Sequence, residues 1–167
     1  QLAYAIGLVL FGRFIDVWGT KICYSGAMIF WSIAAMAHAA VSSVAGFGLA
    51  RFFLGLGESG NFPAAIKATA EWFPKKERAF ATGIFNSGAN IGAVVAPAVI
   101  PWLTINYGWQ ASFIVTGAIG FLWLFAWIPL YSKPELKRNL DPRELAHIQS
   151  DGVESSTQKI SWLSLLG

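Results

Sequence analysis

The sequence predicts an all-α protein, a polytopic helical bundle that crosses a membrane several times. Hydrophobic residues make up 55% of the 167 residues and charged residues only 13%. The mean hydropathy is +0.53, which is far from the usual balance of a soluble domain. Apolar runs long enough to cross roughly 30 Å of hydrocarbon also alternate with brief polar connections. The lipid bilayer is therefore the expected surroundings of most of the chain.

Four apolar runs are long enough to be complete membrane-spanning helices, and a fifth is partial. The complete runs are expected at about residues 22–41, 45–69, 79–103 and 109–131. The partial run, residues 2–11, is too short to cross the hydrocarbon at about 1.5 Å per residue and is expected to end at Gly12. No charged segment precedes it, so we expect the chain to be a piece of a longer protein.

The connections predict the orientation of these helices, because short cytoplasmic loops accumulate Lys and Arg. Residues 12–21, 71–78 and the stretch after Tyr131 are basic, whereas residues 42–43 and 104–108 carry no charge. We expect the basic connections to face the cytoplasm and the others to face outward. Residues 1–131 then form a transmembrane bundle. Residues 132–167 form a cytoplasmic linker with a short helix at about 143–149, and residues 160–166 are either amphipathic or the approach to a further span.

Arg51 and Glu58 are the main functional candidates, because an ionisable residue in the hydrocarbon costs about 2.5 kcal/mol or more. They lie seven positions apart in the third apolar run, on one helix face and about 10 Å apart along its axis. We expect both to face a polar cavity inside the bundle; the alternative is that each has a structural partner on another helix. Pro63 and the glycines before it predict a bent or irregular backbone in this helix.

Asn86 and Asn90 lie one helical turn apart in the next run, with Ser87 beside them. Two amides on one face can bind a polyhydroxylated ligand or join helices, and both interpretations stay open. The net charge of +3 is too small to indicate a nucleic-acid partner. No metal-ligand spacing, nucleophile elbow or phosphate loop is present, so we expect no metal, no cofactor and no enzyme. Aromatic residues near the ends of the runs are expected to be interfacial anchors, namely Trp72, Trp102, Tyr107, Trp109 and Tyr131.

Several stretches resemble a known family. Residues 12–21 (GRFIDVWGTK) resemble the loop signature of the major facilitator superfamily, with Val17 and Thr20 where that signature has arginines. Residues 51–65 (RFFLGLGESGNFPAA), 71–79 (EWFPKKERA) and 108–110 (GWQ) resemble its anion:cation symporter family, most closely the bacterial hexuronate carriers. The resemblance implies a twelve-helix fold, of which this chain holds part of the N-terminal half, about helices 2 to 6, with the first helix missing.

The resemblance also implies roles for individual residues. Glu58 matches a membrane-embedded carboxylate that binds and releases the coupling proton, and Arg51 matches a substrate-binding arginine. Tyr4 matches a cavity-lining tyrosine, and Asn86, Ser87 and Asn90 are expected to face the same site. The cytoplasmic gate motif would comprise Gly12, Asp16, Gly19 and Lys21, with Lys21 or Arg78 in place of a missing arginine.

These roles together imply a proton-coupled symporter of a small organic anion, a sugar acid with hexuronate favoured. It would be a multi-pass protein of the cell's inner (plasma) membrane and would work by alternating access. Arg51 would balance the substrate carboxylate, while Glu58 can exist in its neutral form and exchange its proton. Two alternatives stay open: a facilitator superfamily carrier of another organic anion without proton coupling, or a membrane sensor or scaffold that transports nothing.

Overall fold

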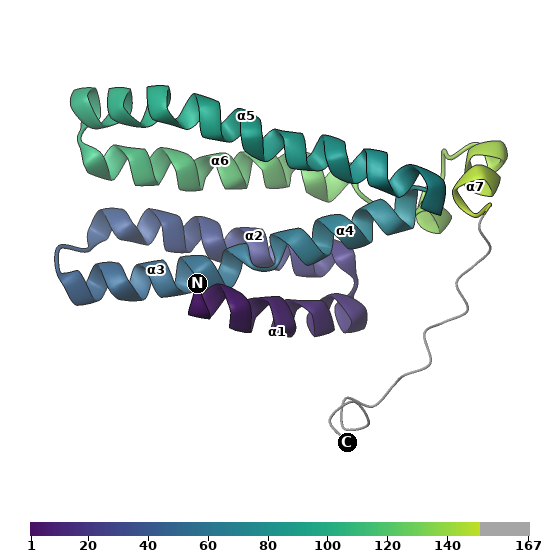
Figure 1. Cartoon of the computed structure of the whole chain (residues 1–167), viewed down its shortest axis with the longest axis horizontal. Coiled ribbons are helices and arrows are strands. Elements are labelled where there is room, and N and C mark those ends of the chain that lie inside the picture. Colours follow the sequence, from purple (N-terminus) through teal and green to yellow (C-terminus); the bar gives the residue numbers. More distant parts are fainter. Residues whose placement is uncertain (151–167) are drawn as a thin grey trace, which may run out of the picture.

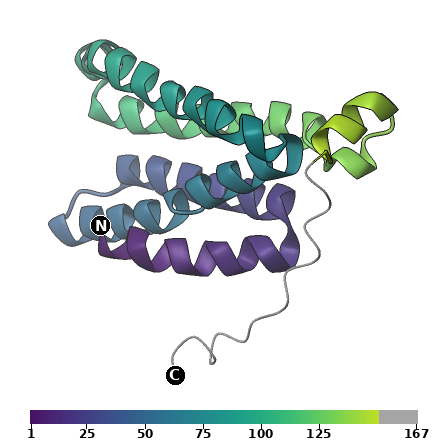
Figure 2. The same ribbon diagram turned by 45° about the vertical axis from the view of Figure 1, so that its right-hand side comes forward.

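The computed structural model describes residues 1–150, and the regular structure of this part is helical. Its α-helices lie along one another in two layers, with α5 and α6 side by side in one layer and α1 to α4 in the other (Figures 1 and 2). The predicted all-α bundle is thus confirmed, whereas the expectation for residues 160–166 falls outside the described residues. The elements in chain order are α1 (Leu2–Trp18), α2 (Thr20–Ala37), the 3-10 helix η1 (His38–Ala40), α3 (Val44–Glu58), α4 (Asn61–Trp72), α5 (Lys75–Tyr107), α6 (Trp109–Leu130), the 3-10 helix η2 (Pro134–Leu136) and α7 (Pro142–Ile148).

Among the described residues, three helical segments are long and apolar enough to cross a membrane. They are Thr20–Ala40 with 21 residues, Lys75–Tyr107 with 33 and Trp109–Leu130 with 22. They coincide with the predicted runs at 22–41, 79–103 and 109–131. The side chains of Phe125 and Leu122 on α6 are 79% and 67% exposed, as expected of helix faces that contact lipid. These helices support the prediction of a membrane protein.

The third predicted run is broken into two helices that follow one another across the bundle, α3 and α4 (Figure 1). The break lies at Ser59 and Gly60, where the chain passes between α1 and α2. A Cβ atom on Gly60 would lie 2.7 Å from the Cβ of Ala27 and 2.8 Å from the ring of Phe11, so only glycine fits. Pro63 falls in the first turn of α4, where its missing N–H is tolerated. The predicted irregularity is therefore confirmed, a few residues before the proline.

Two connections are shorter than predicted. α1 does not end near Gly12 but continues to Trp18, so Gly19 alone connects it to α2. α5 likewise continues to Tyr107 and is followed by Gly108 alone. Both glycines have a positive φ, 83° at Gly19 and 85° at Gly108, which residues with a side chain rarely adopt. The predicted loops at 12–21 and 104–108 were wrong because the end of an apolar run is not the end of a helix.

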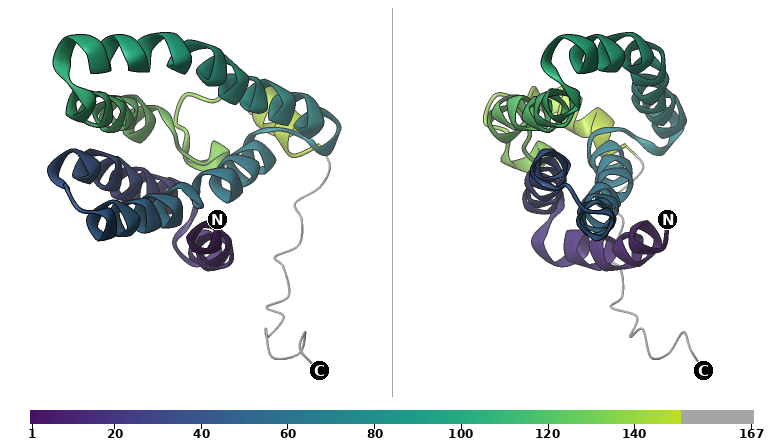
Figure 3. Two further views of the ribbon diagram at one scale, coloured as in Figure 1. Left: turned by 60° about the vertical axis from the view of Figure 1, so that its left-hand side comes forward. Right: turned by 90° about the vertical axis from the view of Figure 1, so that its left-hand side faces the viewer.

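Glycines also set the packing of α2 against its two neighbours, α3 and α6. A Cβ on Gly57 of α3 would lie 2.9 Å from the backbone nitrogen of Trp31, and one on Gly117 of α6 would lie 2.7 Å from the carbonyl oxygen of Ser32. Small residues allow the close approach on which helix association in lipid depends. α5, which contains Pro97 and Pro101, instead curves along its length (Figure 3), as prolines inside a helix favour.

The chain after α6 continues beside the junction of α4 and α5 and includes the short helix α7 (Figure 1). The predicted helix at 143–149 is confirmed and begins one residue earlier, at Pro142. Asp141 is its N-cap, because its carboxylate accepts a hydrogen bond from the backbone N–H of Arg143 at 2.8 Å.

Candidate functional site

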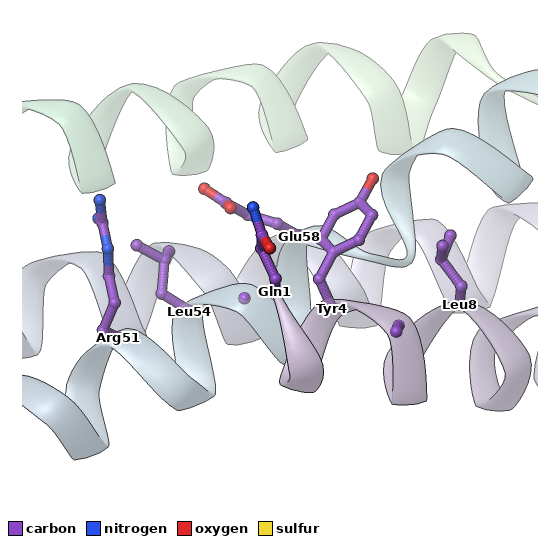
Figure 4. Close-up of a pocket in the computed structure, with 8 residues that line it drawn as sticks. Gln1, Tyr4, Leu8, Arg51, Leu54 and Glu58 are labelled. Carbon is purple, nitrogen blue, oxygen red and sulfur yellow. The ribbon is translucent and has the colours of Figure 1, made fainter.

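A cleft of about 440 Å³ lies between the beginning of α1 and the second half of α3. Gln1, Tyr4, Arg51 and Glu58 point from the two helices into the same space (Figure 4). The remaining wall is apolar or small and is formed by Ala5, Leu8, Leu54 and Gly55.

Helical periodicity explains why these side chains meet. Arg51 and Glu58 are two turns apart on α3, and Leu54 lies between them on the same face. Gln1 and Tyr4 are about one turn apart at the beginning of α1. The structure therefore brings the predicted residues Tyr4, Arg51 and Glu58 to one cleft; their function in binding and coupling stays a prediction.

The cleft combines one guanidinium, one carboxyl group, one phenol hydroxyl and one carboxamide. In the described part of the chain, neither Arg51 nor Glu58 forms an ion pair, so the donors of the guanidinium are available to a ligand. A guanidinium can hold a carboxylate through two parallel hydrogen bonds. The hydroxyl of Tyr4 and the amide of Gln1 can bond to hydroxyl groups. The cleft is thus suited to a small anion that also carries hydroxyls.

Sequence reasoning overlooked Gln1, although a signal for it existed. The residue is polar and directly precedes an apolar run, so it could have been placed on the face of Tyr4 by its spacing of three. It was passed over because only residues inside the run were considered.

Asn86, Ser87 and Asn90 are exposed on α5 and do not line this cleft. The hydroxyl of Ser87 donates to the carbonyl of Ile84 on its own helix at 2.6 Å. A Cβ atom on Gly88 or Gly92 would meet nothing within 4 Å. A polar face at the depth of the hydrocarbon is costly in lipid, so we expect protein or water to cover it. A contact of these three residues with substrate stays a prediction.

Two of the predicted gate residues, Asp16 and Arg78, contact α4, and their role in a gate stays a prediction. Asp16 forms an ion pair with Lys67 of α4, with Nζ and Oδ1 2.6 Å apart. Arg78 instead donates to the carbonyl oxygens of Ala70 and Phe73, at 3.0 Å each, and so caps the end of α4. Gly19 provides the turn, as described above. Lys67 was missed, although it is an ionisable residue within the predicted run 45–69 and the rule applied to Arg51 covers it.

Two of the predicted interfacial anchors are bonded within the protein instead. Tyr131 is only 8% exposed, and its hydroxyl donates to the carboxylate of Glu71. The indole nitrogen of Trp72 donates to the carbonyl of Ser132 at 3.1 Å. These contacts could not be predicted, because the end of an apolar run does not show which helices meet there, and a role of the two residues as interfacial anchors stays a prediction.

Three helical segments in residues 1–150 are long and apolar enough to cross a membrane, and a charged cleft lies between the neighbouring helices α1 and α3. These features define the chain as a polytopic helical membrane protein. The family model described as Major Facilitator Superfamily matches residues 1–166, and the chain belongs to this superfamily. In residues 1–150, no three His, Cys, Asp or Glu side chains gather where they could hold a metal ion.

The chain is also similar in sequence to individual transporters of sugar acids, three of which are described here by identity and coverage. The chain is 38% identical to the hexuronate transporter of Escherichia coli K12 over 156 residues, which is 93% of this chain and 36% of the relative. It is 36% identical to the galacturonate transporter of Dickeya chrysanthemi over 155 residues, 93% of this chain and 45% of the relative. It is 30% identical to the D-galactonate transporter of Escherichia coli O6:H1 over 141 residues, 84% of this chain and 33% of the relative. The chain thus spans less than half the length of each of these relatives, which are named as transporters and not as enzymes.

Proposed function

We propose that this chain is part of a secondary active transporter that carries a sugar acid, with hexuronate favoured, across the cell's inner membrane by alternating access. The observation that carries the proposal is the cleft in which Arg51, Glu58, Tyr4 and Gln1 converge from two helices (Figure 4). The likeness to transporters named for hexuronate and galacturonate supports the choice of substrate class. Residues 1–131 would form the bundle of this half, and residues 132–167 a cytoplasmic linker.

In this proposal each polar group of the cleft has a distinct part in binding. The guanidinium of Arg51 pairs with the substrate carboxylate, because its planar fork matches the two carboxylate oxygens. The hydroxyl of Tyr4 and the carboxamide of Gln1 can then bond to sugar hydroxyls. Leu8 and Leu54 bound the cleft on its apolar side and limit the water that competes for these contacts.

Proton coupling would follow from the presence of a carboxyl group in the same cleft as the arginine. When Glu58 is neutral, the charge of Arg51 attracts the anionic substrate without competition. When Glu58 is ionised, its negative charge opposes that of the substrate. Binding of the proton and binding of the anion then favour each other, and this linkage is reciprocal. Symport of one with the other is the expected consequence.

The substitution Glu58→Gln tests the coupling in the complete carrier. Glutamine has nearly the volume of the neutral acid but cannot release a proton. We expect the variant to lose accumulation driven by a proton gradient while it keeps exchange of internal for external substrate, because exchange does not require the empty, deprotonated carrier to reorient. The measurement is uptake of labelled glucuronate into proteoliposomes, with an imposed gradient or with unlabelled substrate inside. Glu144→Gln on exposed α7 is the matched control.

Three other outcomes of these uptake measurements would contradict parts of the proposal. Undiminished gradient-driven accumulation by the Glu58→Gln carrier would exclude Glu58 as the proton site. If the uptake rate of the unaltered carrier is the same with and without a proton gradient, the result would favour a carrier of organic anions without proton coupling. Absence of uptake of any sugar acid would favour a sensor or scaffold.

A further inference from the structure

The end of the bundle where α5 begins and α6 ends carries an excess of positive charge. Residues 73–80 and 132–140, which flank these helix ends, contain six basic and two acidic residues. Residues 38–50 and 98–115, at the opposite ends of the helices, contain no Asp, Glu, Lys or Arg. The charge of α5, α6 and their flanking residues is thus concentrated at one end of the bundle.

Contacts hold the residues that follow α6 against the junction of α4 and α5. The indole nitrogen of Trp72, the last residue of α4, donates to the carbonyl of Ser132 at 3.1 Å. The ammonium of Lys137 lies 4.8 Å from the centre of the same ring. In the first turn of α5, Oε1 of Glu77 lies 2.8 Å from Nε2 of His147 on α7. Two basic segments that are distant in the sequence therefore lie together (Figure 1).

The six basic residues of these segments differ in what they contact. Arg78 donates to two backbone carbonyls at the end of α4, and Lys137 lies over the ring of Trp72. The other four are exposed, and we call them the basic patch: Lys75, Lys76, Lys133 and Arg138. Glu77 is bonded to His147, and Glu135 is the second acidic residue of the two segments. The patch therefore keeps a net positive charge.

An exposed apolar surface begins directly beside the basic patch. On α5, Phe80 and Ile84 lie one and two turns after Lys76 on the same helix face, and they are 75% and 59% exposed. On α6, which lies beside α5, the last residue is Leu130, and it is 70% exposed. Cations at the base of an exposed apolar surface match a molecule that has an anionic headgroup and apolar chains.

We infer that the basic patch and the apolar faces of α5 and α6 beside it form a binding site for an anionic phospholipid. Ammonium and guanidinium groups donate charge-assisted hydrogen bonds to phosphate oxygens. Basic residues next to a membrane-spanning helix also attract anionic lipid headgroups. The acyl chains would cover Phe80, Ile84 and Leu130. This site is separate from the cleft between α1 and α3, so the inference does not depend on the transport function.

The test measures which lipid the complete carrier retains in detergent. Native mass spectrometry is performed with equal amounts of phosphatidylglycerol and phosphatidylcholine that have the same acyl chains. We expect the unaltered carrier to prefer phosphatidylglycerol about fivefold or more, and the double variant Lys76→Gln, Lys133→Gln to prefer it about twofold or less. The control is Arg13→Gln, Arg143→Gln, which removes the same charge at exposed positions outside the patch and should keep the preference.

A second measurement uses the stability of the same proteins. Phosphatidylglycerol should raise the melting temperature of the unaltered carrier and of the control by about 3 °C or more, and that of the patch variant by less than half as much. Inorganic phosphate without lipid should raise none of them.

Four results would overturn the inference. The unaltered carrier could retain both lipids equally, or the patch variant could keep the full preference for phosphatidylglycerol. An equal loss of preference in the patch variant and the control would indicate a general effect of net charge. An equal rise in melting temperature with inorganic phosphate alone would indicate a site for small anions and not for a lipid.

Discussion

Ionisable side chains on the apolar helices of this bundle form two groups, which differ in what they contact. Arg51 and Glu58 line the cleft, and within residues 1–150 neither has an ion-pair partner. Lys67 and Glu71 are bonded to residues of other helices. The first pair is available to a ligand, while the second holds helices together. Residue type alone does not separate the two groups, because a buried charge is costly in either position.

Arg51→Lys is expected to raise the KM for glucuronate about tenfold or more, although the positive charge is kept. An ammonium is a point charge and cannot form the two parallel hydrogen bonds of a guanidinium with a carboxylate. Transport kinetics of the complete carrier provide the measurement, with Arg143→Lys on exposed α7 as the control. An unchanged KM would show that Arg51 has a structural role instead.

Tyr131 permits a prediction about pH. Burial, then the hydrogen bond to Glu71 and the negative charge of Glu71, raise the pKa of the Tyr131 hydroxyl above its usual value. A group whose pKa is raised on folding stabilises the protein fully below its unfolded pKa, about 10 for tyrosine, and loses this contribution as pH rises further. The melting temperatures of the unaltered carrier and of Tyr131→Phe should therefore differ by a constant amount between about pH 6 and about pH 9 and converge only at higher pH. A difference that shrinks already below about pH 9 would contradict this cause.

At the scale of helices and turns, the structure shows that a helix continues past its apolar run until the backbone requires a turn. α1 passes the polar residues Arg13 and Asp16 without a break and ends before Gly19. The thickness of the hydrocarbon limits the number of apolar residues in a span but does not limit the length of the helix. The backbone hydrogen bonds of a helix remain favourable where it continues into the membrane–water interface. Positive φ at Gly19 and Gly108 determines the two shortest connections.

Gly57→Ala is expected to destabilise the bundle by about 1–3 kcal/mol, because overpacking cannot be relieved there. A Cβ at this position would lie 2.8 Å from the ring of Phe30 and 2.9 Å from the backbone nitrogen of Trp31. Gly48→Ala on the same helix is the control, since a Cβ there meets nothing within 4 Å. Thermal unfolding in detergent compares the two variants. Equal melting temperatures would mean that α2 and α3 can separate to accept the methyl group.

At the scale of the whole molecule, the cleft lies within the layer formed by α1 to α4, and the other layer leaves a polar face of α5 exposed. The layers meet chiefly where α2 packs on α6, and glycines make this contact close. The cleft opens between α1 and α3, while Asn86 and Asn90 remain outside it. Substrate contact by α5 would require further protein or movement beyond the arrangement described here.

The orientation of the bundle can be tested by labelling. Cysteine in place of Ser43 or Asn106 should react with impermeant reagents from outside the cell, and cysteine in place of Lys76 only from the cytoplasm, because basic connections are retained inside. Cys23, the one cysteine of these 167 residues, is buried, and the carrier without substituted cysteines is the control for background labelling. Reaction of positions 43 and 106 from the cytoplasm alone would reverse the orientation.

The sequence by itself determined the all-α membrane bundle, the approximate place of three of its spans and the position of Arg51 and Glu58 on one helix face. Hydrophobic length and helical periodicity are local properties, so a single chain segment is enough to reveal them. The tertiary structure alone decided that Glu71 bonds to Thr20 and Tyr131, which are 51 and 60 positions away, and that Asp16 pairs with Lys67, 51 positions away. Such partners depend on which helix ends meet after packing, and residue type and spacing carry no information about that.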